Sequence, residues 1–133
     1  MNAARSPSPR PLKLLLVEDS RVLADRLIEL IDQTATVELV AQVDNERDAT
    51  TLLRDHPIDV VILDLQLRQG TGFGVLKSLP LGGSRPRIIV LTNFDLPAYR
   101  RQAAELGADF FLDKSREYHR VPEILETLAD TPS

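Results

Sequence analysis

The chain has 133 residues, enough for one domain with its own hydrophobic core. Apolar residues make up 43% of the sequence and charged residues 27%, as in ordinary globular proteins, and the formal net charge of −4 argues against unaided binding to nucleic acid. The absence of cysteine excludes disulfides and thiolate metal sites. The longest apolar run, residues 14–17, is too short to cross a membrane, so we expect no membrane association and a cytoplasmic location.

Strand and helix signals alternate from residue 12 onward. Residues 12–17 predict a short apolar strand, and Ser20 can cap the helix that follows it. Residues 36–43 predict a second strand, and a second helix ends before Pro57. Residues 1–11 are rich in proline and have no apolar segment, which predicts a flexible N-terminal tail.

Residues 58–65, with the sequence Ile-Asp-Val-Val-Ile-Leu-Asp-Leu, predict a strand that is buried on both faces of a parallel sheet. Because an unpaired buried charge is costly, we expect Asp64 at the carboxyl end of this strand, where open α/β sheets bind their ligands. The glycines at positions 70, 72 and 74 predict a flexible exit loop, consistent with a polar group that approaches the backbone there. A third helix is expected beyond the glycines, with its end at Pro80 and the glycines at 82 and 83.

The C-terminal third continues the alternation. Residues 87–92 predict a fourth buried strand that ends at Thr92, and Pro97 and Gly107 mark the start and the end of a fourth helix. A short fifth strand over residues 109–112 leads to Lys114, and a final amphipathic helix follows. Five strands that are each followed by a helix predict a doubly wound α/β domain, with a five-stranded parallel sheet and helices on both faces.

Polar residues follow four of these strands and form the candidate site: Glu18, Asp19, Asp64, Thr92 and Lys114. The carboxyl ends of parallel strands share one edge of the sheet, so these side chains should converge at the switch point of the fold. Three carboxylates at close range repel one another, and a hard divalent cation such as Mg²⁺ relieves that repulsion. Lys114 and Thr92 are suited to meet the oxygens of a phosphoryl group.

The ordered set of residues resembles the receiver domain of two-component response regulators, whose fold is flavodoxin-like. The resemblance covers roughly residues 12–128 and rests on Glu18 and Asp19, Asp64 with Gly72 beyond it, Thr92, and Phe111 three residues before Lys114. It implies a receiver domain over residues 12–129 and a C-terminal tail over 130–133. No room is left for an output domain, so we expect a stand-alone receiver or an excised one.

The resemblance also implies the chemistry of the site. Asp64 would accept a phosphoryl group from a histidine kinase, a phosphotransfer protein or a small donor such as acetyl phosphate. Asp64, Asp19 and the backbone carbonyl of Gln66 would bind Mg²⁺, with Glu18 acting through bound water. Lys114 would pair with Asp64 at rest and with the phosphoryl oxygen afterwards.

A switch in conformation is the implied output. Thr92 would move toward the phosphoryl group, and Phe111 would turn inward behind it. The changed surface, which includes Leu96, Tyr99 and the last helix, would bind a downstream protein. Such a protein catalyses only its own phosphorylation and dephosphorylation, so it is not an enzyme in the usual sense, and we expect a monomer or a weak dimer.

Two alternatives stay open. One is a small Mg²⁺-dependent phosphatase or hydrolase with Asp64 as nucleophile, although haloacid-dehalogenase-like enzymes carry a second acid where this chain has Gln66. The other is a degenerate receiver-like binding module that is never phosphorylated. The chain departs from the usual receiver pattern at Arg68 and Ser115, where proline is common, and at Asn93, where a small residue is common.

Overall fold

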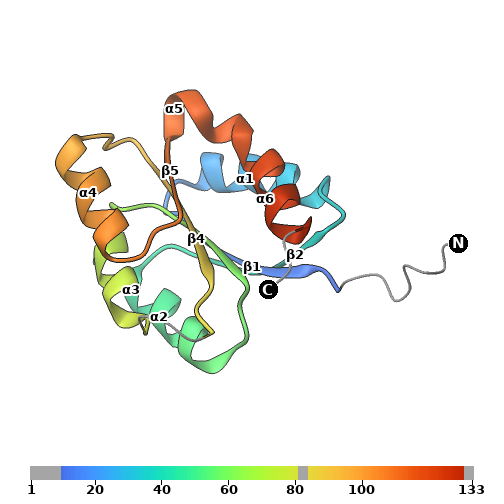
Figure 1. Cartoon of the computed structure of the whole chain (residues 1–133), viewed down its shortest axis with the longest axis horizontal. Coiled ribbons are helices and arrows are strands. Elements are labelled where there is room, and N and C mark those ends of the chain that lie inside the picture. Colours follow the sequence, from blue (N-terminus) through green and yellow to red (C-terminus); the bar gives the residue numbers. More distant parts are fainter. Residues whose placement is uncertain (1–9, 81–83, 131–133) are drawn as a thin grey trace, which may run out of the picture.

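The computed structural model describes residues 10–80 and 84–130, which form a parallel five-stranded sheet with helices on both faces (Figure 1). The strand order is β2-β1-β3-β4-β5, and every neighbouring pair is parallel. The predicted doubly wound fold is therefore confirmed. The elements in chain order are β1 (Leu12–Val17), α1 (Arg21–Asp32), β2 (Val37–Val43), α2 (Glu46–Asp55), β3 (Val60–Leu63), α3 (Gly72–Ser78), β4 (Arg87–Thr92), α4 (Pro97–Glu105), β5 (Phe110–Asp113), α5 (Lys114–Glu117), the 3₁₀ helix η2 (Tyr118–Arg120) and α6 (Val121–Asp130).

Two hydrophobic cores lie on the two faces of the sheet. On one face, residues of α1 and α6 pack against alternate residues of β1, β3 and β4, among them Leu14, Leu16 and Ile62. On the other face, α2, α3 and α4 pack against the intervening residues, among them Leu15 and Val61. All four residues of β3 are buried, as predicted for a strand that is covered on both faces.

Side-chain caps fix the start of three helices. Ser20, Asn45 and Thr71 each have extended backbone and accept a hydrogen bond from the amide three residues further on. These bonds satisfy amides that have no partner within the helix. The caps of α1 and α3 follow β1 and β3 closely, so they also fix the path of the chain as it leaves the candidate site.

The structure corrects the prediction of a flexible loop through the glycines. Helix α3 begins at Gly72, directly after its cap Thr71, so that Gly72 and Gly74 belong to the helix. Glycine is required at position 72 because two segments of backbone approach each other closely there. A side chain at Gly72 would overlap the carbonyl oxygen of Asp64 and lie 2.9 Å from Leu65 Cα. The strand before it is also shorter than predicted. The glycines expected to end the third helix, at 82 and 83, lie outside the described residues.

Gly72→Ala is expected to destabilise the protein by about 3 kcal/mol, because the added methyl group meets rigid backbone rather than a side chain that can move. The free energy of unfolding in urea measures this loss. Gly74→Ala is the matched control, because the atoms nearest to its methyl group belong to the side chain of Glu46, which can move, and alanine favours the helix by about 1 kcal/mol. Equal losses in the two variants would contradict this explanation.

The final amphipathic helix is confirmed as α6, but two short elements before it were not predicted. A four-residue helix, α5, and the 3₁₀ helix η2 come before α6. The Asp113 side chain caps α5 by accepting hydrogen bonds from the amides of Ser115 and Arg116, and Glu117 accepts from the Asp113 amide. These local bonds start a helix without an apolar stripe, which explains why hydrophobic periodicity did not indicate it.

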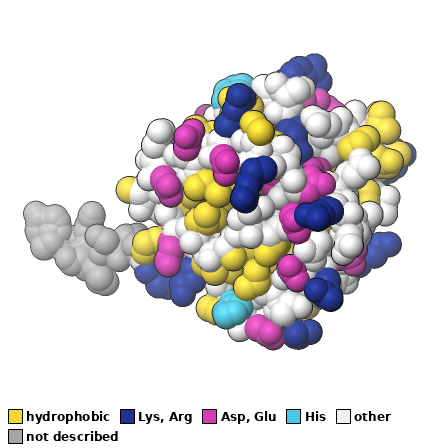
Figure 2. Space-filling view, turned by 180° about the vertical axis from the view of Figure 1, so that it is seen from behind, with side chains coloured by type: hydrophobic (Ala, Val, Ile, Leu, Met, Phe, Trp, Pro, Cys, Tyr) yellow, Lys and Arg dark blue, Asp and Glu magenta, His cyan; other side chains and the backbone are white. Residues whose placement is uncertain are grey.

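Most of the predicted N-terminal tail, residues 1–9, lies outside the described residues, as do residues 131–133, and α6 continues through Asp130. No helix within residues 10–80 and 84–130 is long and apolar enough to span a membrane. On the face shown in Figure 2, acidic and basic side chains are interspersed.

Candidate functional site

The fold brings the predicted polar residues to the carboxyl edge of the sheet. Glu18 follows β1 and Asp64 follows β3, and these two strands are neighbours at the point where the strand order reverses. Thr92 ends β4, and Lys114 begins α5 directly after β5. An open α/β sheet has its ligand-binding crevice at this position.

Lys114 joins the first and third strands across the edge. Its Nζ lies 2.6 Å from Asp64 Oδ2 and 3.0 Å from Glu18 Oε1. The Glu18 side chain is 2% exposed, that of Asp64 6% and that of Lys114 11%, so the three charges interact away from bulk water. Removal of Lys114 leaves two buried carboxylates without their partner, whereas removal of either carboxylate leaves the ammonium paired with the other.

Burial and charge shift the pKa values of Glu18 and Lys114, and the two shifts have different causes. Burial raises the pKa of the Glu18 carboxyl, the nearby charge of Asp64 adds to this effect, and the amide of Ser20 and the ammonium of Lys114 oppose it. Burial alone would lower the pKa of Lys114, but its hydrogen bond and charge interaction with Asp64, together with Glu18, outweigh burial and raise it. Lys114 is therefore positively charged at neutral pH.

Asp19 adds a third carboxylate at the mouth of the site, where it is exposed. Carboxylate oxygens of Glu18, Asp19 and Asp64 lie within 4.8 Å of one another. The ammonium group of Lys114 pairs with Glu18 and Asp64, and the carboxylate of Asp19 beside them leaves an excess of negative charge at this edge. An all-oxygen donor set with excess negative charge fits a hard divalent cation.

The other predicted site residues surround this cluster. The amide of Gln66 donates to Asp64 Oδ1 at 3.3 Å, which places this residue beside the carboxylate. Thr92 is fully buried, and its hydroxyl accepts from the amide of Phe94. Phe111 is half-buried, with the guanidinium of Arg100 stacked 4.7 Å from its ring centre.

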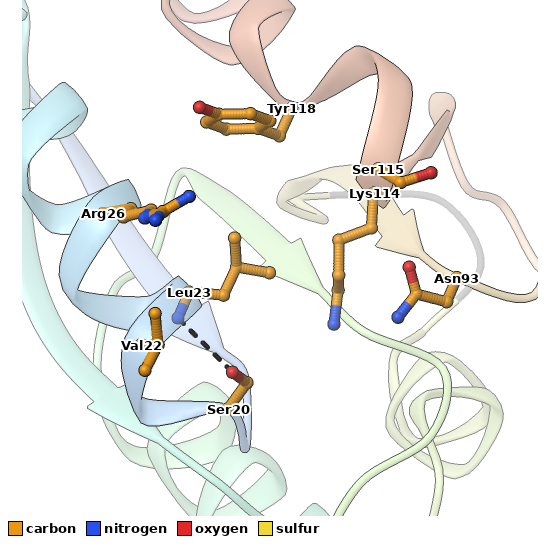
Figure 3. A pocket seen from close by; sticks show the side chains of 8 residues that line it. All are labelled: Ser20, Val22, Leu23, Arg26, Asn93, Lys114, Ser115 and Tyr118. Atoms are coloured by element: carbon orange, nitrogen blue, oxygen red, sulfur yellow. Dashed lines mark hydrogen bonds between the residues drawn. The ribbon is translucent and has the colours of Figure 1, made fainter.

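A groove of about 360 Å³ opens beside Lys114 (Figure 3). One wall comes from the start of α1, and the other from the loop after β4 and from α5 and η2. Figure 3 shows Lys114 and Asn93 side by side on the second wall, with Arg26 across the groove on α1. Its lining residues are Ser20, Val22, Leu23, Arg26, Asn93, Lys114, Ser115 and Tyr118, which include two cations and no carboxylate.

Sequence reasoning missed the α1 side of this groove. The signal was Val22, which lies outside the apolar stripe of α1 and is 66% exposed. It also missed Asp95, which pairs with Arg100 on α4 at 2.5 Å and with Arg116 on α5 at 3.7 Å. Asp95 therefore ties the loop after Thr92 to the helices on both sides of β5, and no pattern in the sequence indicates that contact.

The fold and the site define a doubly wound α/β domain with a lysine-bridged acidic site at its switch point. The family model of the response regulator receiver domain matches residues 14–126. The chain therefore belongs to the receiver-domain family of two-component response regulators. Receiver domains generally bind Mg²⁺ and interact with histidine kinases or phosphotransfer proteins.

Named relatives agree with this assignment. The chain is 27% identical to the Fimbriae Z protein of Salmonella typhimurium over 93% of its own length and 61% of that protein. It is 31% identical to the sensory transduction protein LytT of Bacillus anthracis, over 86% of its own length and 46% of that protein. The chain thus spans about half of the length of these relatives.

Solved structures show the same fold. A DNA-binding response regulator of the LuxR family from Staphylococcus aureus has a TM-score of 0.80 and 27% identity, with 90% of this chain and 99% of that chain covered. The non-phosphorylated HemR receiver domain from Leptospira biflexa has a TM-score of 0.79 and 26% identity, with 92% and 97% covered.

Proposed function

We propose that this receiver accepts a phosphoryl group on Asp64 and signals by a change of conformation. The observation that carries the proposal is the ammonium of Lys114 held between Asp64 and Glu18 at the switch point, 2.6 Å from the acceptor carboxylate. Phosphoryl transfer requires mainly positioning and the neutralisation of charge. A carboxylate nucleophile beside a fixed ammonium supplies both.

The transfer step follows from the contacts of Asp64. A carboxylate oxygen attacks the phosphorus atom and forms a P–O bond, and the bond from phosphorus to the donor breaks with its electron pair left on the donor. With a phosphohistidine the leaving group is an imidazole, and with acetyl phosphate it is acetate. Lys114 Nζ then pairs with a phosphoryl oxygen, and the hydroxyl of Thr92 turns toward the same group.

The chain offers residues that fit a bound Mg²⁺. Asp19, Asp64 and the backbone carbonyl of Gln66 would hold the ion, with Glu18 acting through water. When bound, the ion supplies positive charge against the three carboxylates and the incoming phosphoryl group. Glu18 also contacts Lys114 directly, and this contact holds the Lys114 side chain beside Asp64.

The groove beside Lys114 supports access for a donor. It leads from the exposed Val22 to Lys114, next to Asp64, and its cations Arg26 and Lys114 favour an anionic group (Figure 3). The donor is a histidine kinase or a phosphotransfer protein. The protein then catalyses only its own phosphorylation and slow hydrolysis, so it acts as a switch and not as an enzyme with turnover.

The output surface is the face built by α4, β5 and the helices after β5. Leu96 is 51% exposed, while Tyr99 and Phe111 are half-buried, so a turn of Phe111 changes what this face presents. A protein target would bind there. The acyl phosphate favours one of two packings of the domain, and the signal is a shift in their populations.

Intact-mass measurement tests the proposal. The protein is incubated with Mg²⁺ and acetyl phosphate, and in parallel with phosphoramidate, each with and without a chelator. A single phosphoryl addition that the chelator prevents is the expected result. Continuous release of inorganic phosphate at many turnovers per molecule would instead support the phosphatase, and no addition from either donor would support the inert binding module.

A further inference from the structure

The segment between Asp64 and helix α3, residues 65–71, carries Gln66, and its second half contacts the start of α2. Leu65 and Leu67 are buried in the core, whereas residues 68–71 are exposed, so apolar packing fixes only the first half of this loop. Its conformation nevertheless decides where the backbone carbonyl of Gln66 lies. The contacts that fix the loop are therefore part of the proposed Mg²⁺ site.

Glu46, the first residue of α2, contacts the loop at two points. Its amide donates to the carbonyl of Gln69 at 3.0 Å, and its Oε1 accepts from the amide of Thr71 at 3.0 Å. Asn45 forms a parallel bridge with Gln69 beside these bonds. The second half of the loop is thus bonded to the start of α2 through backbone and side chain together.

Two of the glycines make room for this carboxylate. A methyl group at Gly70 or Gly74 would overlap the side chain of Glu46. Gly74 lies inside α3, where glycine lowers helix stability by about 1 kcal/mol relative to alanine. The space that Glu46 needs explains why glycine stands there. The polar group that the sequence led us to expect against this backbone is Glu46.

The position of Thr71 is transmitted to Gln66 across the base of the loop. Gln66 and Thr71 form an antiparallel bridge, and the amide of Gly72 donates to the carbonyl of Leu65 at 2.9 Å. On the outer side Arg68 pairs with Asp44 at 3.2 Å, but the Arg68 side chain is 72% exposed and that of Asp44 37%, so water screens the pair and it adds little. Glu46 is the contact that holds the Thr71 end of the bridge.

We propose that Glu46 is a positioning residue for the acceptor site, which holds the carbonyl of Gln66 in place for Mg²⁺ through Thr71. This inference rests on the proposed function, because it assigns a role relative to the same Mg²⁺ site. Residues that orient metal ligands without touching the metal typically change metal affinity by 10- to 100-fold when they are removed. A backbone carbonyl has no rotamer of its own, so the fixed path of its loop is what orients it.

The test is the affinity for Mg²⁺, measured by isothermal titration calorimetry on the whole chain. Glu46→Ala is expected to weaken Mg²⁺ binding about tenfold and to shift the amide NMR signals of residues 66–71. Glu46→Gln keeps an oxygen acceptor for the Thr71 amide and is expected to bind Mg²⁺ nearly as well as the wild type. Asp55→Ala removes one negative charge from the other end of α2, where the side chain pairs with its neighbour Arg54, and should leave the affinity unchanged.

Gly74→Ala gives a second, independent variant. Its methyl group displaces the carboxylate of Glu46 while alanine favours the helix, so Mg²⁺ affinity should fall although stability in urea does not. Wild-type affinity in both folded variants would overturn the role of Glu46 and leave the proposed function intact. A wild-type protein that neither binds Mg²⁺ nor takes up a phosphoryl group would overturn both.

Discussion

Asp64→Asn is expected to abolish phosphoryl uptake from acetyl phosphate, with no mass addition under conditions that fully modify the wild type. The carboxamide has nearly the same shape as the carboxylate but cannot form an acyl phosphate. The carboxamide oxygen can still accept a hydrogen bond from Lys114, and Lys114 keeps Glu18 as its charged partner, so the fold should be retained. Intact-mass spectrometry measures the addition, and urea unfolding checks the fold.

The control for this experiment is Asp55→Asn, which makes the same chemical change at an exposed carboxylate on α2. This variant should be modified like the wild type. Persistent addition in the Asp64→Asn protein would place the acceptor elsewhere. Peptide mapping of the modified wild type after reduction of the acyl phosphate would then identify that residue.

Lys114→Met is expected to cost about 3 to 5 kcal/mol of unfolding free energy in the absence of divalent cations. Methionine fills a similar volume but leaves Glu18 and Asp64 buried and unpaired. Lys77→Met is the matched control, because Lys77 lies exposed on α3, and it should change stability by less than about 1 kcal/mol. If the two variants were equally stable, Lys114 would not be essential to the charge balance of the site.

The loss in Lys114→Met should depend on pH. Without the ammonium, the pKa of Glu18, already raised by burial, rises further above its ordinary value of 4.5. A carboxyl with a higher pKa in the folded state binds protons more strongly when folded, so the folded state loses stability as pH rises through that range. The deficit relative to the wild type should therefore be smaller near pH 5 than near pH 7. Mg²⁺ should recover part of it at neutral pH.

Most of the fold and the main site positions could be predicted because they depend on local patterns. Residues 58–65 indicated a strand buried on both faces, and the four residues of β3 are indeed buried. Since parallel strands end at one edge, strand-end polar residues such as Asp64 and Lys114 had to converge there. The strand order brings Asp64 and Lys114 to the same edge, and their opposite charges then pair there.

The features that could not be predicted depend on contacts between distant side chains. Glu46 meets the backbone of Thr71, which is 25 positions away in the sequence, and periodicity carries no information about such a pair. Helix α5 has no apolar stripe and begins through the cap at Asp113. The glycines were assigned to a loop because their number suggested freedom, whereas they are small to admit the backbone of Asp64 and the carboxylate of Glu46.

The hydrogen bond from the Phe94 amide to the hydroxyl of Thr92 bears on how the switch responds to partial phosphorylation. Under the proposed mechanism, Thr92 cannot turn toward a phosphoryl group without releasing that amide. The segment after Thr92 would therefore rearrange at the same time, and the exposed side chains of Phe94 and Leu96 would move with it. The acyl phosphate would favour this rearranged surface in each modified molecule, so the fraction of molecules that a binding partner recognises should rise with the extent of phosphorylation.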